Sequence, residues 1–279
     1  LVDTPSDLGA MGEWPTHPEL LDWLACEFAA RGWSLKAMHR LMVCSSVYQT
    51  MGHPHPVGRI VNPSSAASDR SNGTDYQSVL QARWQKLIAE DPRNELLGRM
   101  RRQRLDGEAI RDGMLSAAGL LNREAGGPGV RPPLPQEVTS TLLKNQWPVT
   151  EDAGDWHRRS LYLFVRRNLP YPLLSVFDRP DTNQSCPARN ETTIAPQALH
   201  LLNSGFALEC AEALADRLEH AAPGDTPRQI ELATLLTLGH PPDETERHAA
   251  EAFLAGGSRE DLLDYCLALF NLNEFVYVD

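Results

Sequence analysis

The sequence lacks several signatures that would assign a function directly. It contains no apolar run of the roughly 20 residues that a transmembrane helix needs, so we expect no membrane span. It also lacks a Gly-x-Ser-x-Gly nucleophile elbow, a His-Glu-x-x-His zinc helix, a phosphate-binding Gly-x-x-x-x-Gly-Lys loop and a dinucleotide-binding fingerprint. These absences exclude the motif-defined enzymes but leave open triads and carboxylate pairs, which are recognised by geometry.

Cysteine is present without any motif. None of the five cysteines stands in a Cys-x-x-Cys or Cys-x-x-Cys-His sequence, which excludes a zinc ribbon, a thioredoxin-type centre and c-type haem attachment within this chain. Cys26, Cys44, Cys210 and Cys266 fall within apolar helical patterns, so we expect buried, unreactive thiols at these four positions.

Basic residues are scarce, at 26 against 37 acidic ones, and the imbalance is local. Residues 205–279 contain 15 acidic and four basic residues, so this quarter carries a net charge equal to the whole chain's −11. An acidic tail argues against nucleic acid as a partner, because phosphate binding needs a basic surface. The basic run Arg99–Arg104 is followed by acidic residues up to Asp112, which predicts an intramolecular salt-bridge face.

Aromatic residues are also few, at 7%, which favours helices over sheet. Apolar residues recur at helical spacing after Thr16 and after Ser34, and again in residues 77–90, 106–121, 195–202, 206–218, 226–238, 243–255 and 259–270. Residues 161–165, Leu-Tyr-Leu-Phe-Val, are the best strand candidate. The predicted fold is therefore mainly α, a bundle-like helical domain with long irregular loops and at most a minor strand element. The predicted core includes Leu21, Leu24, Leu41, Leu115, Leu163, Leu199 and Leu214.

Composition also suggests a domain organisation. Gly, Pro, Ser and Asn dominate residues 52–76, which we interpret as a flexible insert or linker. We expect a main helical domain over residues 1–204 that contains this insert, and an acidic helical subdomain over residues 205–279.

The most polar segment is the loop at 178–191. Asp178 and Asp181 could act as an acid/base pair in glycan hydrolysis. A ligand could be bound by Arg179, Asn183, Gln184 and Arg189, and by His157 and His200, which flank the segment. The same oxygens could instead hold a divalent cation. A third interpretation is a structural loop whose Asp and Asn side chains bond its own backbone.

Several segments resemble one family. They are Thr-His-Pro-Glu-Leu-Leu-Asp-Trp-Leu at 16–24, Arg-Leu-Asp-Gly-Glu-Ala-Ile-Arg-Asp at 104–112, and Arg-Arg-Ser-Leu-Tyr-Leu-Phe-Val at 158–165. Phe-Asp-Arg-Pro-Asp-Thr-Asn-Gln-Ser-Cys-Pro at 177–187 and Ala-Pro-Gln-Ala-Leu at 195–199 continue the likeness. Together they resemble the planctomycete DUF1553 family, which often follows a cytochrome-c-like domain. Residues 52–90 depart from its pattern as an insertion, and the family's usual start lies upstream of Leu1.

The resemblance implies export beyond the cytoplasmic membrane and a multidomain parent, whose upstream domains would be partners of this chain. It implies no established activity and no catalytic residue, and any haem would belong to an upstream domain. Two functional hypotheses follow. The chain is either an accessory or interaction module, or an extracytoplasmic hydrolase that acts on a glycan through the loop at 178–191.

Overall fold

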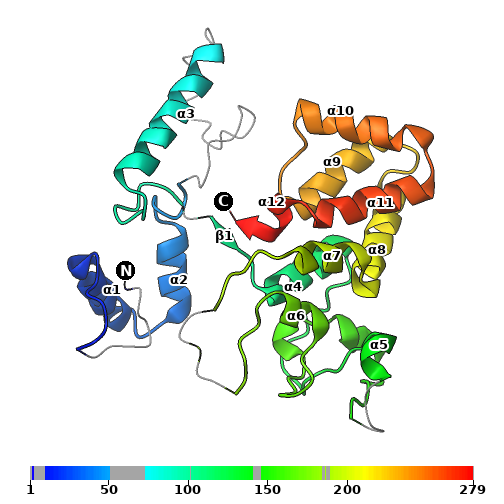
Figure 1. The fold of residues 1–279 in the computed structure, drawn as a ribbon, viewed down its shortest axis with the longest axis horizontal. Coiled ribbons are helices and arrows are strands. Elements are labelled where there is room, and N and C mark those ends of the chain that lie inside the picture. Colours follow the sequence, from blue (N-terminus) through cyan, green and yellow to red (C-terminus); the bar gives the residue numbers. More distant parts are fainter. Residues whose placement is uncertain are drawn as a thin grey trace. The chain divides into compact units, whose positions relative to one another are not determined.

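A computed structural model describes residue 2 and residues 10–50, 73–100, 102–140, 146–183, 186 and 189–278, with the backbone alone for 73–81. The fold is mainly α, as predicted, with a two-stranded sheet as its only named sheet in the described part. The chain divides into two compact units, residues 1–103 with 279, and residues 104–278. Figure 1 shows the helices of each unit. No described helix is both long and apolar enough to cross a membrane.

The first unit contains α1 (Pro18–Ala30), α2 (Leu35–Val43) and α3 (Gly73–Glu90). Ser34 caps α2 as predicted, since its hydroxyl accepts a bond from the backbone N–H of Ala37 at 3.3 Å. Thr16 does not cap α1, because the N-cap residue is His17 and its side chain makes no capping bond. Residues 52–72 of the predicted insert lie outside the described residues, and its last four residues belong to α3.

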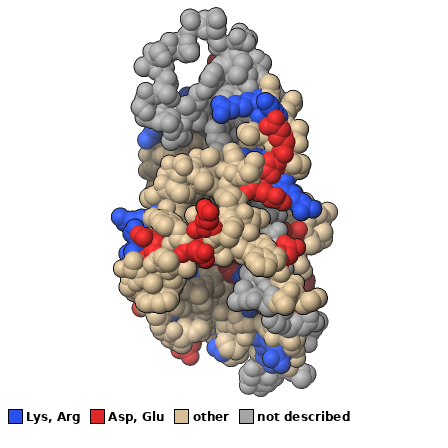
Figure 2. Space-filling view, turned by 90° about the vertical axis from the view of Figure 1, so that its left-hand side faces the viewer, with Lys and Arg blue, Asp and Glu red and all other residues tan. Residues whose placement is uncertain are grey.

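The apolar side chains of α1 are not buried, which contradicts part of the predicted core. Leu21 is exposed, and Leu24 and Leu41 are half-buried. Cys26 and Cys44 are exposed as well, so the expectation of buried thiols at these positions was wrong. Helical periodicity identifies a face that can be buried, but it does not say whether another element covers that face. Figure 2 shows one face of the molecule, with broad uncharged areas between small groups of charged side chains.

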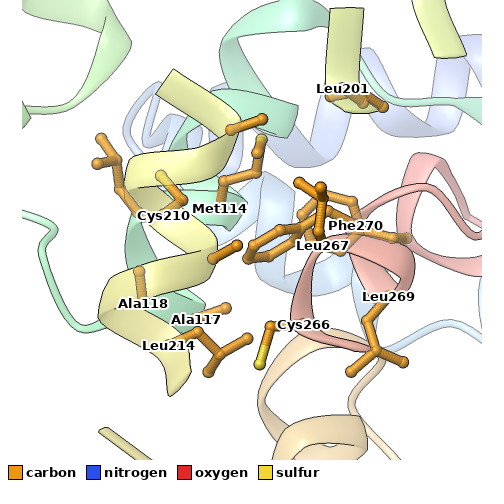
Figure 3. Packing of buried hydrophobic residues seen from close by; sticks show 14 of the residues in the cluster. Met114, Ala117, Ala118, Leu201, Cys210, Leu214, Cys266, Leu267, Leu269 and Phe270 are labelled. Atoms are coloured by element: carbon orange, nitrogen blue, oxygen red, sulfur yellow. The ribbon is translucent and has the colours of Figure 1, made fainter. Parts of the chain in front are cut away.

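The second unit is built on three helices, α4 (Gly107–Ala118), α8 (Gly205–Ala221) and α11 (Arg259–Phe270). The central helix is α8, which packs against both α4 and α11 (Figure 3). Its buried face is made of small and branched residues at helical spacing, and this lets the three helices approach closely. The buried side chains at this junction include Met114, Leu115, Ala118, Cys210, Ala211, Leu214, Leu218, Cys266, Leu267 and Phe270.

The remaining helices surround this core. They are α5 (Gln136–Thr139), α6 (Pro172–Val176), α7 (Ala195–Asn203), α9 (Thr226–Thr237), α10 (Glu244–Phe253) and α12 (Asn273–Val276), with the 3₁₀ turns η1 (Ala153–His157), η2 (Ser160–Tyr162) and η3 (Leu254–Gly256). Asp225, Asp243 and Ser258 cap α9, α10 and α11 through their side-chain oxygens. The sequence predicted these three helices, at 226–238, 243–255 and 259–270, from apolar spacing and without these caps.

The strand predicted at 161–165 is not formed. The first part of this segment is η2, and Leu163 makes one isolated parallel bridge with Val130. Val130 donates to the Tyr162 carbonyl and accepts from the Phe164 N–H, both at 2.8 Å. The ladder stops there because Gly126, Gly127 and Pro128 precede Val130 and do not continue a strand. The named sheet instead joins β1 (Gln103–Arg104) to β2 (Tyr277–Val278).

Burial in the second unit confirms three predicted core residues and contradicts one. Leu115, Leu163 and Leu214 are buried, and so are Cys210 and Cys266. Leu199 is 55% exposed, because it lies on the outer side of α7 while Leu201 turns inward. The predicted boundary at residue 204 stays a prediction, and α8, which begins immediately after it, packs on α4.

Candidate functional site

A cleft of about 450 Å³ lies where η1, the start of α6 and the start of α8 meet. We call it the histidine cleft, because it brings together His157 and His200, the two histidines predicted to bind a ligand. Three aromatic side chains, Trp156, Tyr171 and Phe206, contribute to its walls. The further lining residues are Arg111, Pro132, Pro133, Leu134, Pro135, Glu137, Pro172, Leu173, Ser204, Gly205 and Glu209.

One wall is the segment Arg131–Pro135, whose prolines prevent it from forming a helix. Two tryptophans fix it. The Trp147 indole donates to the Pro132 carbonyl at 2.8 Å, and the Trp156 indole donates to the Thr150 carbonyl at 2.7 Å. Thr150 in turn accepts from the Arg131 N–H through its hydroxyl at 2.9 Å. The proline wall is therefore held at several points and forms a preformed surface of the cleft.

A histidine and a carboxylate meet at the edge of the cleft. The Nε2 atom of His157, the last residue of η1, lies 2.9 Å from Oε1 of Glu209 on α8. Asp152 supports η1 by accepting the Gly154 N–H at 2.8 Å. The pair is partly exposed, so its remaining oxygen and nitrogen atoms are accessible to a ligand.

The buried side of the cleft contains an arginine. Arg111 is 1% exposed, and its guanidinium lies 5.8 Å from the Tyr171 ring centre and 5.4 Å from that of Phe206. Nη2 donates to the Trp156 carbonyl at 2.7 Å and Nη1 donates to the Arg158 carbonyl at 2.9 Å. Arg111 therefore fixes the η1 segment and the two aromatic rings relative to α4.

His200 supplies a second imidazole from the last turn of α7. Burial lowers the pKa of His200, because a charged imidazolium loses hydration there. It is therefore neutral near pH 7, with one nitrogen donating and the other accepting. The cleft thus combines aromatic faces with a few directed polar groups, which is the usual composition of a small-molecule site.

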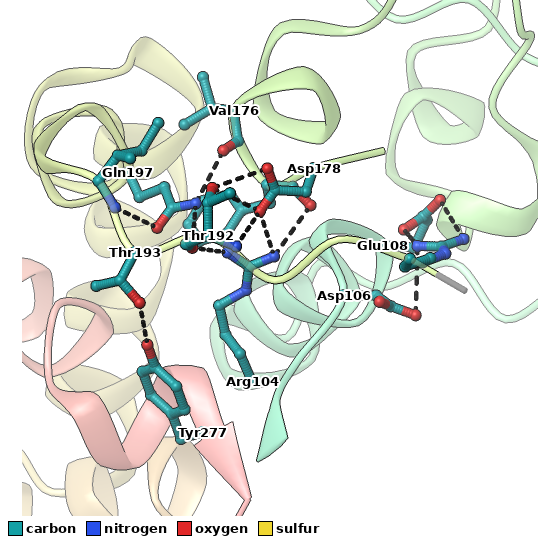
Figure 4. A network of polar contacts seen from close by, with 12 residues as sticks. Arg104, Asp106, Glu108, Val176, Asp178, Thr192, Thr193, Gln197 and Tyr277 are labelled. Atoms are coloured by element: carbon teal, nitrogen blue, oxygen red, sulfur yellow. Dashed lines mark hydrogen bonds and ion pairs between the residues drawn. The ribbon is translucent and has the colours of Figure 1, made fainter. Parts of the chain in front are cut away.

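Asp178, predicted as an acid/base residue, lies in a closed polar network (Figure 4). One of its oxygens is 2.9 Å from Nη2 of buried Arg104, and Thr192 donates to the carboxylate from its N–H and its hydroxyl, both at 2.8 Å. Arg104 also donates to the Thr192 carbonyl, and Gln197 donates to the same carbonyl at 3.0 Å. Burial alone would raise the pKa of Asp178, but the bonds from Thr192 and Arg104 outweigh it and lower the pKa.

The backbone of Asp178 is in the left-handed region, with φ +57°. Asp tolerates this region better than most residues, and its carboxylate closes the turn onto Thr192. In this structure Asp178 therefore links Thr192 to Arg104. Its assignment as a catalytic group stays a prediction that the geometry does not favour, because a general acid needs a raised pKa.

The other predicted loop residues separate into different surroundings. Exposed Asp181 accepts bonds from the N–H and the side-chain amide of Asn183, which is a local turn. Gln184 lies outside the described residues. Arg179 and Arg189 line a second cleft, away from the two histidines. The structure therefore does not bring the described members of the predicted set together in one place.

The described residues do not form a recognisable metal site. Across the described residues, no group of three or more His, Cys, Asp or Glu side chains is arranged to hold a metal ion. A divalent cation in the loop at 178–191 stays a prediction.

Glu209 and Arg111 are among the lining residues of the histidine cleft that sequence reasoning missed. Glu209 is one of many acidic residues on the helices of residues 205–279, and the sequence does not distinguish it from a solvated one. Arg111 was assigned to a surface salt-bridge face because acidic residues flank it. Its neighbours on α4, Ile110 and Met114, are apolar, and this was the signal in the sequence that the Arg111 side chain faces inward. Both neighbours are buried in the structure.

Comparison with known proteins gives a family and no activity. No curated protein and no solved structure matches this chain. A family model described as PSD1, protein of unknown function (DUF1553), matches residues 1–254. That match includes α4, η1, α6 and the start of α8, the elements that form the histidine cleft. The chain belongs to the DUF1553 family.

Proposed function

We propose that this chain is an accessory, non-catalytic module of an exported multidomain protein, and that it binds a neutral glycan segment in the histidine cleft. The observation that carries this proposal is the His157–Glu209 contact at 2.9 Å beside the rings of Trp156, Tyr171 and Phe206. Sugar rings present C–H faces that pack on aromatic rings and hydroxyls that need directed hydrogen bonds. The cleft offers both kinds of group, and 450 Å³ accommodates one or two sugar rings.

The pKa directions of two carboxyl groups outside the histidine cleft argue against hydrolysis by the predicted residue Asp178 and in the second cleft. A glycosidase requires one carboxyl group with a raised pKa as its general acid. The pKa of Asp178 is lowered, and so is that of Glu108 in the second cleft. Both carboxylates accept bonds from arginines, so neither is available as a proton donor near neutral pH.

The test is isothermal titration calorimetry with neutral disaccharides, namely cellobiose, maltose and N,N′-diacetylchitobiose. Glu209→Gln and His157→Gln each remove one charged or ring partner, and we expect a roughly tenfold weaker Kd for each. Glu212→Gln is the matched control, because Glu212 is exposed on the same helix and does not line the cleft. Unchanged affinity in both cleft variants would contradict the proposal. Hydrolysis of the disaccharide to monosaccharides would also contradict it.

The first unit favours a second role, as a docking surface for an upstream domain of the same parent protein. Its helix α1 has no buried residue although most of its residues are apolar. Trp14 is 91% exposed and Trp33 is 70% exposed. Such exposure is unusual for tryptophan on a surface that binds no partner. A partner domain would cover these rings. Each Å² of apolar surface that it removes from water would stabilise the contact by about 25 cal/mol.

This role is tested with the full-length protein and with the upstream region expressed separately. Trp14→Ser and Trp33→Ser should weaken the association of this chain with the upstream region. Trp147→Phe, within the second unit, should leave that association unchanged. Equal association for all variants would remove the docking role and would leave the glycan proposal untouched.

A further inference from the structure

A second cleft, of about 650 Å³, lies on another side of α4 and carries several arginines. We call it the arginine cleft. It is lined by residues from the start of α4, by residues 159–161 and 163–165, and by Arg179 and Arg189. Part of its wall is apolar and exposed, since Leu161, Phe164 and Val165 are 73%, 38% and 46% accessible. These side chains lie beside charged groups, which gives the cleft an amphipathic character.

Most charges of this cleft neutralise one another. Arg189 donates two bonds to the Glu108 carboxylate, at 2.7 and 3.2 Å, and lies 3.3 Å from Asp106 (Figure 4). Asp112 accepts the Ser160 N–H at 2.7 Å and lies 3.9 Å from Nε of Arg159. The three carboxylates of the cleft are thus each engaged by a cation or a backbone N–H.

Arg179 differs from the other arginines of the cleft. Among the described residues, no carboxylate lies within 4 Å of its guanidinium, and its charge acts on Glu108 only from a longer distance. It is half-buried, so its loss of hydration is not offset by a direct ion pair. A guanidinium with free N–H donors in a concave site can donate two parallel hydrogen bonds to a carboxylate or a sulfate.

The geometry points to the arginine cleft as an oxyanion-binding site, in which Arg179 holds a carboxylate or sulfate ester while Leu161, Phe164 and Val165 contact an apolar face of the ligand. This site shares only the Tyr171 side chain with the histidine cleft, and it does not depend on the glycan proposed there. The anion would lie against the Arg179 guanidinium, because the carboxylates of Asp106, Glu108 and Asp112 repel it elsewhere in the cleft.

The probes are D-glucuronate and glucose 6-sulfate, which share a sugar ring and differ in the oxyanion, with glucose as the neutral reference. Calorimetry should show millimolar or tighter binding of at least one anion, weaker at higher salt, and at least tenfold tighter than any binding of glucose. Arg179→Gln should weaken that binding at least tenfold. Arg179→Lys should retain part of the anion binding, because lysine keeps the positive charge but cannot donate two parallel hydrogen bonds.

Two control variants distinguish binding at Arg179 from a general effect of positive charge and from binding in the histidine cleft. Arg228→Gln removes a charge on α9, where Arg228 pairs with Glu231 at 2.7 Å, and it should not change anion binding. His157→Gln should not change it either, since His157 lines the other cleft. The inference is overturned if neither anion binds, if glucose binds the His157→Gln variant as tightly as the anions do, or if Arg179→Gln leaves the binding of both anions unchanged.

Discussion

The Asp178 carboxylate and the Arg104 guanidinium meet at 2.9 Å and join the loop after α6 to the chain just before α4. Arg104 is buried, and its Nη1 and Nη2 atoms donate to the carbonyls of Thr192 and Phe177. One ion pair therefore connects three segments that are distant in the sequence. Its removal should affect the whole second unit and not the loop alone.

We expect Asp178→Ala to destabilise the second unit by about 2–4 kcal/mol, because it leaves a buried guanidinium without its counter-ion. Asp178→Asn should cost less, since an amide oxygen can still accept bonds from Thr192 and Asn tolerates the left-handed backbone. Asp181→Ala, at an exposed turn of the same loop, is the control and should cost about 0.5 kcal/mol or less. Urea unfolding followed by circular dichroism measures all three.

The same ion pair predicts how stability depends on pH. The pKa of Asp178 is lowered in the folded state from its ordinary 3.8, so its contribution is fully present above that value. The contribution is lost as the pH falls through the lower, folded pKa. Melting temperatures measured from pH 7 to pH 2.5 should therefore fall steeply below about pH 4 in the wild type. Asp178→Asn should show a shallower fall, and identical curves would contradict the linkage.

Two glycines of α4 predict opposite responses to alanine. A Cβ at Gly107 would lie 3.0 Å from Cβ of Phe177 and 3.3 Å from the Leu174 backbone, so Gly107→Ala should destabilise by about 1–3 kcal/mol. At Gly113 the nearest atom is the Phe275 ring at 3.4 Å, an ordinary contact. Gly113→Ala should be neutral or stabilise by up to about 1 kcal/mol, because alanine favours helix. Thermal unfolding of the two variants side by side decides the sign of each.

The cysteines should separate into two reactivity classes. Burial raises the pKa of Cys210 and of Cys266 to about 12, so neither forms thiolate at pH 8. Cys26, Cys44 and Cys186 are exposed. Iodoacetamide at pH 8 should therefore alkylate these three in the native protein and all five in denaturant, as counted by mass spectrometry. Rapid native labelling of Cys210 or Cys266 would show that the core of the second unit opens.

Much of the helical fold could be predicted because its signals are local. Helix α11 was predicted at its observed bounds, since its apolar residues recur at helical spacing and Gly256-Gly257 precede it. The errors arise where the outcome depends on distant partners. Leu199 and Cys26 fit apolar faces, but whether such a face is covered is set by tertiary packing. The run at 161–165 fits a strand, but Val130 offers it a single bridge.

The candidate site could be predicted only in part for the same reason. His157 and His200 were selected because they flank a polar segment, and they do share a cleft. Their partner Glu209 lies 52 residues from His157 and has no local signature. The carboxylates at 178 and 181 were selected for the local density of polar residues alone, and their bonds to Thr192 and Asn183 are visible only in three dimensions.

The packing of α8 on α4 has a consequence for synthesis of the chain. Arg217 on α8 donates to the Ala117 carbonyl at the end of α4, across 100 residues of sequence. During translation, the buried face of α4 is therefore without its main partner until the ribosome has made those later residues. A nascent or truncated chain that ends near residue 204 would expose Met114 and Leu115, and such intermediates are substrates for chaperones and proteases. Expression yield should accordingly fall more from truncations within α8 than from deletions within residues 52–72.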